Sequence, residues 1–260
     1  MPAPRDLAHT VGGAAATLGL TLPMGFVGTI QTYLDELDRW QRIGALTAYR
    51  DPAARVRHLV LESLMLLAAV PPPGSPLLDI GSGPGIPGLI VKLARPDWDV
   101  VLVEAARRRA NFLRHVIRML GLRGVSVYGQ RAETLGTSDL ASRFGTVTMR
   151  AVAAPPAALE LAYPFLEPAG TVVLPLGPRG AFARGAIRDV TLATPGELPW
   201  RRRFLIIRRA ELEGRVPRGT EQSGGAHDCR REPEGRRWED DHRREPRERA
   251  RGGQPADPSG

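Results

Sequence analysis

One stretch, residues 77–88, constrains the fold of this chain more than any other part of its sequence. An apolar run containing Asp79 leads into a bend with glycine at positions 81, 83 and 85, and a second apolar run follows at 88–94. Glycine suits such a bend because the backbone needs positive φ and because a ligand must approach it closely. The N-terminus of the following helix offers free N–H groups and partial positive charge. The stretch therefore predicts a buried strand, a loop that binds a nucleotide-like cofactor, and a helix.

Two kinds of cofactor fit this loop. Gly83, Gly85 and Gly88 satisfy the dinucleotide pattern G-x-G-x-x-G, and Glu104 ends the next strand-like run, where a ribose-binding acid is expected. Asp79 argues against NAD, because a carboxylate at the entrance of the loop would repel a pyrophosphate and attract the cationic groups of S-adenosylmethionine. We therefore expect S-adenosylmethionine, with Asp79 and Glu104 among its binding residues.

Strand and helix patterns alternate between residues 74 and 210. This alternation predicts an α/β fold, a Rossmann-like parallel sheet with ligand binding at the carboxyl ends of its strands. Glu104, Glu133 and Arg150 each follow a predicted strand and should meet at that edge. Strands are expected at 77–80, 100–104, 125–128, 146–149 and 171–176, helices at 88–94, 105–120 and 155–166, and a closing antiparallel pair at 190–193 and 204–207.

Three segments flank this predicted domain. Residues 1–23 are expected to be poorly ordered, and residues 24–73 to form a helical lead-in with one helix starting at Pro23 and another over 53–69. Asp51 and Pro52 form an N-cap and N1 pair for the second of these helices. Residues 214–260 are rich in Arg, Glu, Asp, Pro and Gly and are expected to be a disordered charged tail.

Composition narrows the partners and the compartment. The net charge is +8, which fits a polyanionic partner such as RNA, although the abundance of Arg over the single Lys92 also fits a bias in genome composition. Cys229 is the only cysteine, so a disulfide framework is excluded and a reducing compartment is favoured. No apolar run is long enough for a membrane span and the histidines lack metal-ligand spacing. We expect a cytoplasmic protein without a metal.

Several motifs in order resemble one family, the small-subunit (16S) rRNA guanine-N7 methyltransferase G family, also called the glucose-inhibited division protein B family. The resemblance runs from about Tyr33 to Arg209 and is most specific in the doubled Gly-Pro pattern of the loop. The motifs that carry it are Arg39-Trp40, Leu46-Thr47-Ala48-x-Arg50-Asp51-Pro52, His58 before Glu62-Ser63-Leu64, Asp79 through Gly88, Arg108-Arg109-x-x-Phe112-Leu113, Arg131-Ala132-Glu133 and Met149-Arg150-Ala151-Val152-Ala153.

The resemblance implies a class I S-adenosylmethionine-dependent methyltransferase that methylates N7 of one guanine in 16S rRNA or the small ribosomal subunit. It implies that Gly81 and Ile86 contact the cofactor in the loop and that Ala132 and Glu133 line its adenine end. Arg150 would lie near cofactor and substrate, as a positioning group without a general base. Arginine side chains suit contacts with phosphates and bases. Separately, we expect the protein to be a monomer. The expected cofactor-binding residues are Asp79, Gly81, Gly83, Gly85, Ile86, Glu104, Ala132, Glu133 and Arg150, and the expected RNA contacts are Arg108, Arg109 and Arg131.

The chain departs from the family mainly in the substrate half. Gln41 and Ala45 stand where the family has asparagines, Met149 where it has a serine, and Leu176-Gly177 where it has Leu-Lys-Gly. Two alternatives therefore stay open. The chain could be an S-adenosylmethionine-dependent enzyme acting on another RNA or a small molecule, or a cofactor-binding RNA-interaction protein without turnover. His58 lies on an apolar helix, where a hydrogen-bonded core histidine is favoured over a substrate contact.

Overall fold

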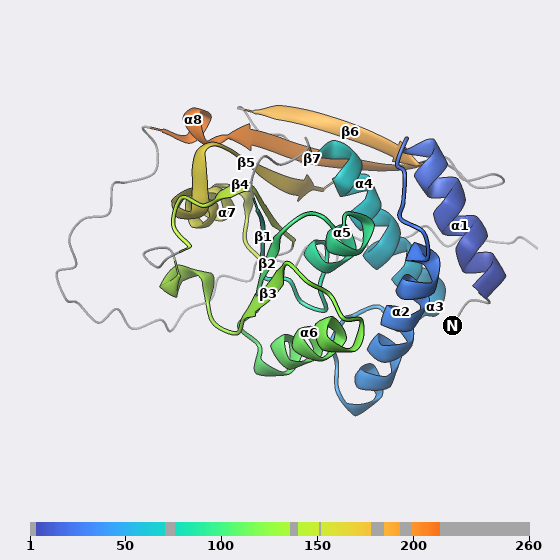
Figure 1. Ribbon diagram of the computed structural model, residues 1–260. Helices are drawn as coiled ribbons and strands as arrows, with labels where there is room; N and C mark the ends of the chain where they lie inside the picture. The colour runs from blue at the N-terminus through green and yellow to red at the C-terminus, as the bar shows by residue number, and fades with distance from the viewer. Residues whose placement is uncertain are drawn as a thin grey trace, which may run out of the picture. The chain divides into compact units, whose positions relative to one another are not determined.

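The computed structural model describes residues 4–70, 76–135, 140–150, 152–177, 185–192 and 199–213. Its first part is helical and comprises α1 (Pro4–Thr17), α2 (Phe26–Ile43) and one continuous run of α3 (Pro52–Arg55), the π-helical η1 (Val56–Leu61) and α4 (Glu62–Ala69). Strands and helices then alternate, as Figure 1 shows, in the order β1 (Leu77–Ile80), α5 (Gly88–Ala94), β2 (Val100–Val103), α6 (Arg107–Met119), β3 (Val125–Tyr128), η2 (Ala132–Thr134), β4 (Phe144–Met149), α7 (Pro155–Ala162), η3 (Tyr163–Phe165), β5 (Leu166–Leu176), β6 (Ala186–Leu192), β7 (Trp200–Arg208) and α8 (Arg209–Leu212).

The seven strands of the described residues form one sheet in the order β3-β2-β1-β4-β5-β7-β6. Strands β1 to β5 run parallel, with Leu77 beside Val100 of β2 and Thr146 of β4. β7 pairs antiparallel with β5, and β6 pairs antiparallel with β7. This confirms the predicted α/β fold and its closing antiparallel pair. The strand order reverses between β1 and β4, which is where a fold of this kind binds its ligand.

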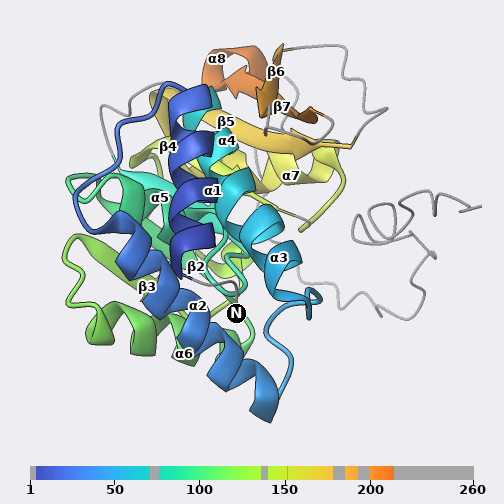
Figure 2. The same cartoon turned by 90° about the vertical axis from the view of Figure 1, so that its right-hand side faces the viewer.

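Alternate residues of the strands face two separate apolar layers. Leu77 and Leu102 pack with Phe112 of α6 and with residues of α2, α4 and α5, whereas Leu78 and Val103 pack with residues of α7. This alternation follows from the two-residue repeat of a strand. Figure 2 shows α5 and α7 on opposite sides of the strands. The lead-in helices thus share one core with the sheet, and together they support the edge that carries the glycine loop.

The first helix corrects the expectation for the start of the chain. Residues 1–23 were expected to be poorly ordered, yet Pro4–Thr17 forms α1, with Leu7, Val11 and Ala14 buried on one face. Their spacing is that of a helical stripe. A methyl group built on Gly12 or on Gly13 would meet no described heavy atom within 4 Å. Gly12 and Gly13, which interrupt the apolar pattern, therefore lie outside the buried face of the helix. The expectation that this segment is poorly ordered is wrong for residues 4–17.

Local backbone chemistry sets the other element ends. Asp51 accepts a hydrogen bond from Ala54 N at 2.7 Å, which confirms the predicted N-cap. α2 begins at Phe26 after Gly25, whose φ is +81°, rather than at Pro23. The helix predicted over 155–166 ends earlier, because Pro164 has no N–H to continue α7, and β5 already begins at Leu166.

The predicted tail, residues 214–260, lies outside the described residues. Within the described residues, no helix is both long and apolar enough to cross a bilayer.

Candidate cofactor and substrate site

The glycine loop leaves β1 and turns back over the end of β2. The N–H groups of Gly81 and Ser82 both donate to the carbonyl of Val103, at 2.8 and 3.0 Å. Gly81 has φ +71° and Gly83 has φ +55°, a region that residues with a side chain rarely adopt. The turn is therefore fixed against the sheet by its own backbone, and its sequence is set by that conformation.

One glycine of this loop has open space beside it. A methyl group on Gly81 would lie 2.4 Å from Cγ2 of Val152, and one on Gly88 would lie 2.7 Å from Cβ of Asp79. At Gly83 the nearest described atom would be the carbonyl oxygen of Gly81, at 4.0 Å. Among the described residues, Gly83 is thus the loop position at which a ligand could lie against bare backbone.

Glu104 follows β2 and braces this loop. Its Oε2 accepts a hydrogen bond from Gly83 N at 2.8 Å, and its Oε1 accepts one from Ala106 N at 2.8 Å, next to the start of α6. The side chain is buried. A carboxylate oxygen can accept a second hydrogen bond, so the expected contact with a ribose hydroxyl stays a prediction beside this structural role.

Asp79 lies beneath the loop rather than at its entrance. It is fully buried on β1, and its Oδ2 accepts a hydrogen bond from Gly88 N at 2.9 Å. Its Oδ1 has no hydrogen-bond partner within the described part of the chain. Burial raises the pKa of Asp79 to about 7, and the charge of Glu104 adds to the effect, while the Gly88 N–H opposes it. Sequence alone gives Asp79 a full negative charge, whereas its burial beneath the loop favours the protonated carboxyl more than exposure would.

These features fit S-adenosylmethionine. The unsatisfied Asp79 oxygen is an acceptor for a cationic or N–H group, Gly83 offers open backbone, and Glu104 supplies carboxylate oxygens at the same strand edge. η2 follows β3, the neighbour of β2, with Ala132 buried and Arg131 and Glu133 exposed. An apolar residue there suits the expected adenine end. The roles of Ala132 and Glu133 in cofactor binding stay predictions.

We expect Gly83→Ala to weaken binding of S-adenosylhomocysteine at least ten-fold while the protein stays folded. The added methyl group would occupy the open side of the loop, whereas the positive φ itself costs about 1–2 kcal/mol of stability. Gly121→Ala is the matched control, because Gly121 has φ +62° and no described atom within 4 Å of the added methyl. Calorimetry should show that the two variants lose equal stability and that only Gly83→Ala loses affinity for S-adenosylhomocysteine. Equal affinities for the two variants would contradict this role of Gly83.

The pKa of Asp79 gives a second prediction, for cofactor uptake. If Asp79 Oδ1 faces a cationic group of the cofactor, binding requires the ionised carboxyl, so affinity should rise with pH up to about 7 and then level off. Calorimetric titrations between pH 5.5 and 8.5 measure this. Asp79→Asn should remove the rise, while titration of the ligand's own amino group affects both proteins. Identical pH profiles for the wild type and Asp79→Asn would mean that Asp79 only holds the start of α5, through its bond to Gly88 N.

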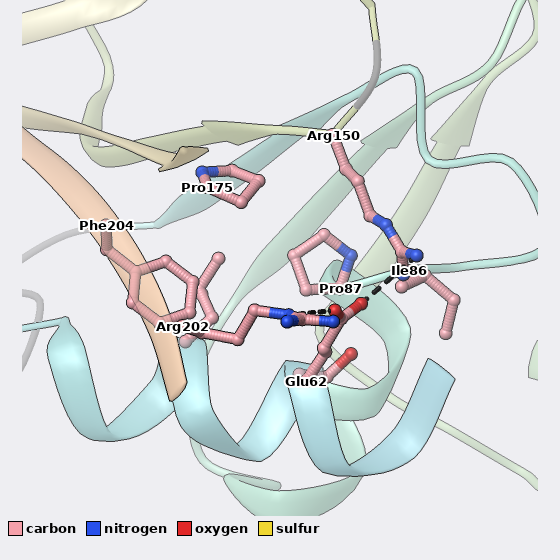
Figure 3. Close-up of a pocket in the computed structure, with 9 residues that line it drawn as sticks. Glu62, Ile86, Pro87, Arg150, Pro175, Arg202 and Phe204 are labelled. Atoms are coloured by element: carbon pink, nitrogen blue, oxygen red, sulfur yellow. Dashed lines mark hydrogen bonds and ion pairs between the residues drawn. The ribbon is translucent and has the colours of Figure 1, made fainter. Parts of the chain in front are cut away.

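A small pocket lies beside the loop and is shown in Figure 3. Glu62 enters it from α4, Arg150 from the end of β4, and Arg202 from β7. The remaining wall is apolar apart from Ser63 and is made by Ser63, Leu66, Ile86, Pro87, Pro175 and Phe204. Ile86, expected to contact the cofactor, therefore joins the glycine loop to this pocket.

Arg150 is held by the helical lead-in. Its Nη1 donates to the carbonyl of His58 at 2.6 Å, and its Nη2 lies 3.2 Å from Tyr49 Oη and 3.1 Å from Glu62 Oε2. Its side chain is only 14% exposed. Sequence reasoning placed Arg150 near cofactor and substrate. The structure places it in the pocket with Ile86 and Pro87 and gives its guanidinium three protein partners, so a positioning role is the one its geometry supports.

Glu62 is the centre of the charge network. It pairs with Arg150 and with Arg202 Nε, and its Oε1 lies 3.7 Å from His58 Nδ1. Burial alone would raise the pKa of Glu62, but the charge of Arg150, the nearby His58 and the charge of Arg202 together hold it at about 2. Glu62 is therefore ionised at neutral pH and pairs with two arginines from different strands, Arg150 from the end of β4 and Arg202 from β7.

An aromatic stack lies beside this charge network. The rings of Tyr49 and His58 are stacked with centroids 4.6 Å apart, and Trp200 meets His58 edge-on at 5.7 Å. Arg57 and Arg202 lie over the Trp200 ring, at 4.9 and 4.3 Å from its centroid. The His58 side chain is only 15% exposed. This packing supports the interpretation of His58 as a core histidine.

Sequence reasoning did not assign Glu62, Arg202 or Trp200 to the site. Glu62 was noted only as part of a motif, and Arg202 is 140 residues away from it in the sequence. The arginines at 201–203 were visible in the sequence, but the antiparallel register of β7 decides which of them points inward.

The expected RNA contacts divide into two groups. Arg108 donates to the carbonyl of Trp40 at 2.8 Å and packs under Gly44, so it ties α6 to the end of α2. Arg109 and Arg131 are exposed. The geometry thus favours a structural role for Arg108, while contacts of Arg109 and Arg131 with RNA stay predictions.

Two departures from the family have structural explanations. Gln41 accepts hydrogen bonds from Leu46 N and Thr47 N, at 2.6 and 3.1 Å, and donates to the Thr47 carbonyl, so it fixes the turn after α2. Met149 is buried in the core beneath β4. Neither side chain needs to contact a substrate, so these two substitutions do not argue against the family's activity. Within the described residues, no group of three or more Asp, Glu, His or Cys side chains could hold a metal ion.

The fold and the site define the class of protein. A parallel sheet with a glycine loop after its first strand and an acid after its second is the architecture of enzymes that bind a nucleoside-containing cofactor. The family model for rRNA small subunit methyltransferase G (GidB) matches residues 27–181. The chain belongs to this family.

Individual relatives agree with this family. A ribosomal RNA small subunit methyltransferase G from Sorangium cellulosum (strain So ce56) is 42% identical over 166 residues, which cover 63% of this chain and 70% of the relative. The protein of that name from Chloroflexus aggregans (strain MD-66 / DSM 9485) is 42% identical over 161 residues, covering 61% and 67%. The one from Geobacter sp. (strain M21) is 39% identical over 160 residues, covering 61% and 72%. These findings confirm the predicted family, the rRNA small subunit methyltransferases G.

Proposed function

We propose that this protein transfers a methyl group from S-adenosylmethionine to N7 of one guanine in 16S rRNA. The observation that carries the proposal is the open backbone of Gly83 in a loop that bonds to two buried carboxyl groups, Glu104 and Asp79, in a chain of the rRNA small subunit methyltransferase G family. The resemblance of the sequence motifs to that family supplies the choice of N7.

Guanine N7 suits a site of this kind. Its lone pair is free at neutral pH, so no proton has to be removed before attack and no general base is needed. Bound S-adenosylmethionine supplies an electrophilic methyl group on a sulfonium. The protein then contributes mainly alignment, which is worth up to roughly 7–11 kcal/mol in favourable cases.

The pocket residues are suited to alignment. Arg150 is fixed by the carbonyl of His58 and the hydroxyl of Tyr49, and Glu62 compensates its charge. Compensation matters because the purine gains positive charge during transfer, and an unpaired cation close to N7 would oppose that. In this proposal Arg150 and Glu62 hold the wall beside the glycine loop in place, with Arg150 directed to the guanine O6, a phosphate or the cofactor carboxylate.

The proposal includes the setting of the reaction. The substrate is the small-subunit RNA or a particle containing it, and the enzyme acts as a monomer in the cytoplasm.

Two measurements test the proposal in sequence. S-adenosylhomocysteine at 100 times its dissociation constant should stabilise the purified protein by about 2.7 kcal/mol against unfolding, and NADH should not. Radiolabelled methyl transfer to isolated small ribosomal subunits, followed by nuclease digestion, should then place the label in N7-methylguanosine. Stabilisation by NADH alone would contradict the cofactor, and label in another nucleoside would contradict the target atom. Binding without transfer to any RNA would favour the non-catalytic alternative.

A further inference from the structure

The positive charge of this chain is concentrated in one segment. Residues 105–131 contain seven arginines and no Asp or Glu, in a protein whose net charge is +8. The segment comprises α6, the turn that follows it, and β3, which is the edge strand of the sheet. Because neighbouring positive charges repel one another, so many arginines in one segment call for acidic partners within the protein or an anionic ligand outside it.

α6 places three of its five arginines along one face. Arg107, Asn111, Arg114 and Arg118 follow the i, i+4, i+7, i+11 spacing of a single helical stripe, and all four are exposed. The other side of the helix buries Phe112, Leu113 and Val116 in the core. Eleven residues of helix span about 16 Å. We call the exposed stripe, together with Arg131, the α6 arginine face.

This face reaches the edge of the sheet where the cofactor is expected. Arg114 Nη2 lies 3.4 Å from the carbonyl of Val127 on β3, and a methyl group on Gly129 would lie 2.8 Å from the same nitrogen. Arg131 follows directly, beside η2, while Tyr128 accepts a hydrogen bond from Glu104 N at 3.0 Å. The face therefore runs from the glycine-loop edge along the outside of α6, which Figure 1 shows beside β3.

The arginines of the face have no ion-pair partner among the described residues. Arg107, Arg118 and Arg131 make no salt bridge there, and the Nη1 of Arg114 donates only to Asn111, at 3.3 Å. The nearest acid in sequence to Arg131 is the exposed Glu133. Apart from Met119, which is 39% exposed, no large apolar side chain of α6 is exposed. Protein interfaces are depleted of charged residues at their centre, so a face of arginines without exposed apolar area favours a polyphosphate.

We propose that the α6 arginine face docks the phosphate backbone of the RNA that carries the target guanine. The inference rests on the proposed function and deepens it by naming the surface that holds the RNA outside the reaction site. Guanidinium groups suit phosphate oxygens geometrically. Such contacts fix the register of the RNA and add affinity without reading its sequence.

The test compares two double variants that each lose two positive charges. Arg107→Gln with Arg118→Gln removes two charges from the face, and Arg201→Gln with Arg208→Gln removes two exposed charges from β7. Binding of a small-subunit RNA fragment is measured from 50 to 300 mM KCl, with methyl transfer measured in parallel. In the face variant, the fall of log affinity with log salt should become less steep by about 1.4. Each lost phosphate contact on single-stranded RNA changes this slope by about 0.7. The KM of the face variant for RNA should rise while kcat is kept, and the β7 variant should behave as wild type.

Equal slopes for the two variants, with methyl transfer by the wild type intact, would overturn the docking surface alone. A wild-type protein that methylates no small-subunit RNA would overturn the proposed function instead. If the face variant binds RNA normally but loses affinity for another protein, the anionic occupant is a protein and the inference is wrong.

Discussion

Replacing Glu62 with glutamine is expected to lower the free energy of unfolding by about 3–5 kcal/mol at pH 7. The substitution keeps the shape of the side chain but leaves Arg150 and Arg202, whose side chains are 14% and 13% exposed, without their counter-charge. Removing one partner of a buried ion pair is costly because the remaining charge stays desolvated. Urea denaturation of the two proteins measures the difference.

The same experiment has an internal pH control. The pKa of Glu62 in the folded protein, about 2, is below its ordinary value of 4.5, so its contribution to stability is present above pH 4.5 and is lost as the pH falls through about 2. The gap between wild type and Glu62→Gln should therefore narrow over that range. Glu36→Gln is the matched variant, because Glu36 is buried but its partners Arg39 and His115 are 70% and 32% exposed. It should cost under about 1 kcal/mol. Equal costs for the two variants would show that Glu62 does not hold the arginines.

Replacing Arg150 with lysine is expected to reduce kcat for methyl transfer about 100-fold. Lysine keeps the charge but cannot bond to the His58 carbonyl, the Tyr49 hydroxyl and the Glu62 carboxylate at once in the planar geometry of a guanidinium. The pocket wall next to Ile86 and Pro87 would then shift, and a displacement of about 1 Å can cost that factor. Single-turnover kinetics with saturating cofactor and RNA measures kcat separately from binding.

Arg55→Lys distinguishes positioning from general stability. Arg55 is also buried, bonds to the Tyr49 carbonyl at 2.9 Å and to Asp38 at 2.7 Å, and does not line the pocket. Both variants should lose stability, but Arg55→Lys should keep kcat within a few-fold of wild type. A parallel fall in kcat for both would mean that Arg150 supports the fold only.

The elements that sequence predicted most closely are those with short, local determinants. β1, α5 and β3 lie at the predicted residues, because apolar runs bounded by Gly, Pro or charged residues leave little choice of boundary. β5 was predicted to start at residue 171 and begins at Leu166, through Pro168 and Gly170. Leu166 pairs with Phe144 of β4 ahead of a register shift, and regular pairing resumes at Thr171, so the early start depends on one tertiary contact that the local sequence does not show.

The candidate site likewise has residues that the local sequence could place and residues that only the tertiary structure places. The glycine loop and Glu104 could be placed from sequence because they follow strand ends that meet at one sheet edge. The ionisation of Asp79 could not, because its pKa depends on burial beneath the loop. Arg202 could not either, since its contact with Glu62 depends on the register of an antiparallel strand far along the chain. The same holds for Arg108, which the local pattern does not separate from its exposed neighbours.

The central claim is that this protein makes N7-methylguanosine in small-subunit rRNA. Mass spectrometry of 16S rRNA digests from a strain lacking the protein, compared with its parent, tests it directly. We expect one N7-methylguanosine to be missing, to return with the intact gene, and not to return with Arg150→Ala. Digests with the same N7-methylguanosine content in both strains would contradict the claim.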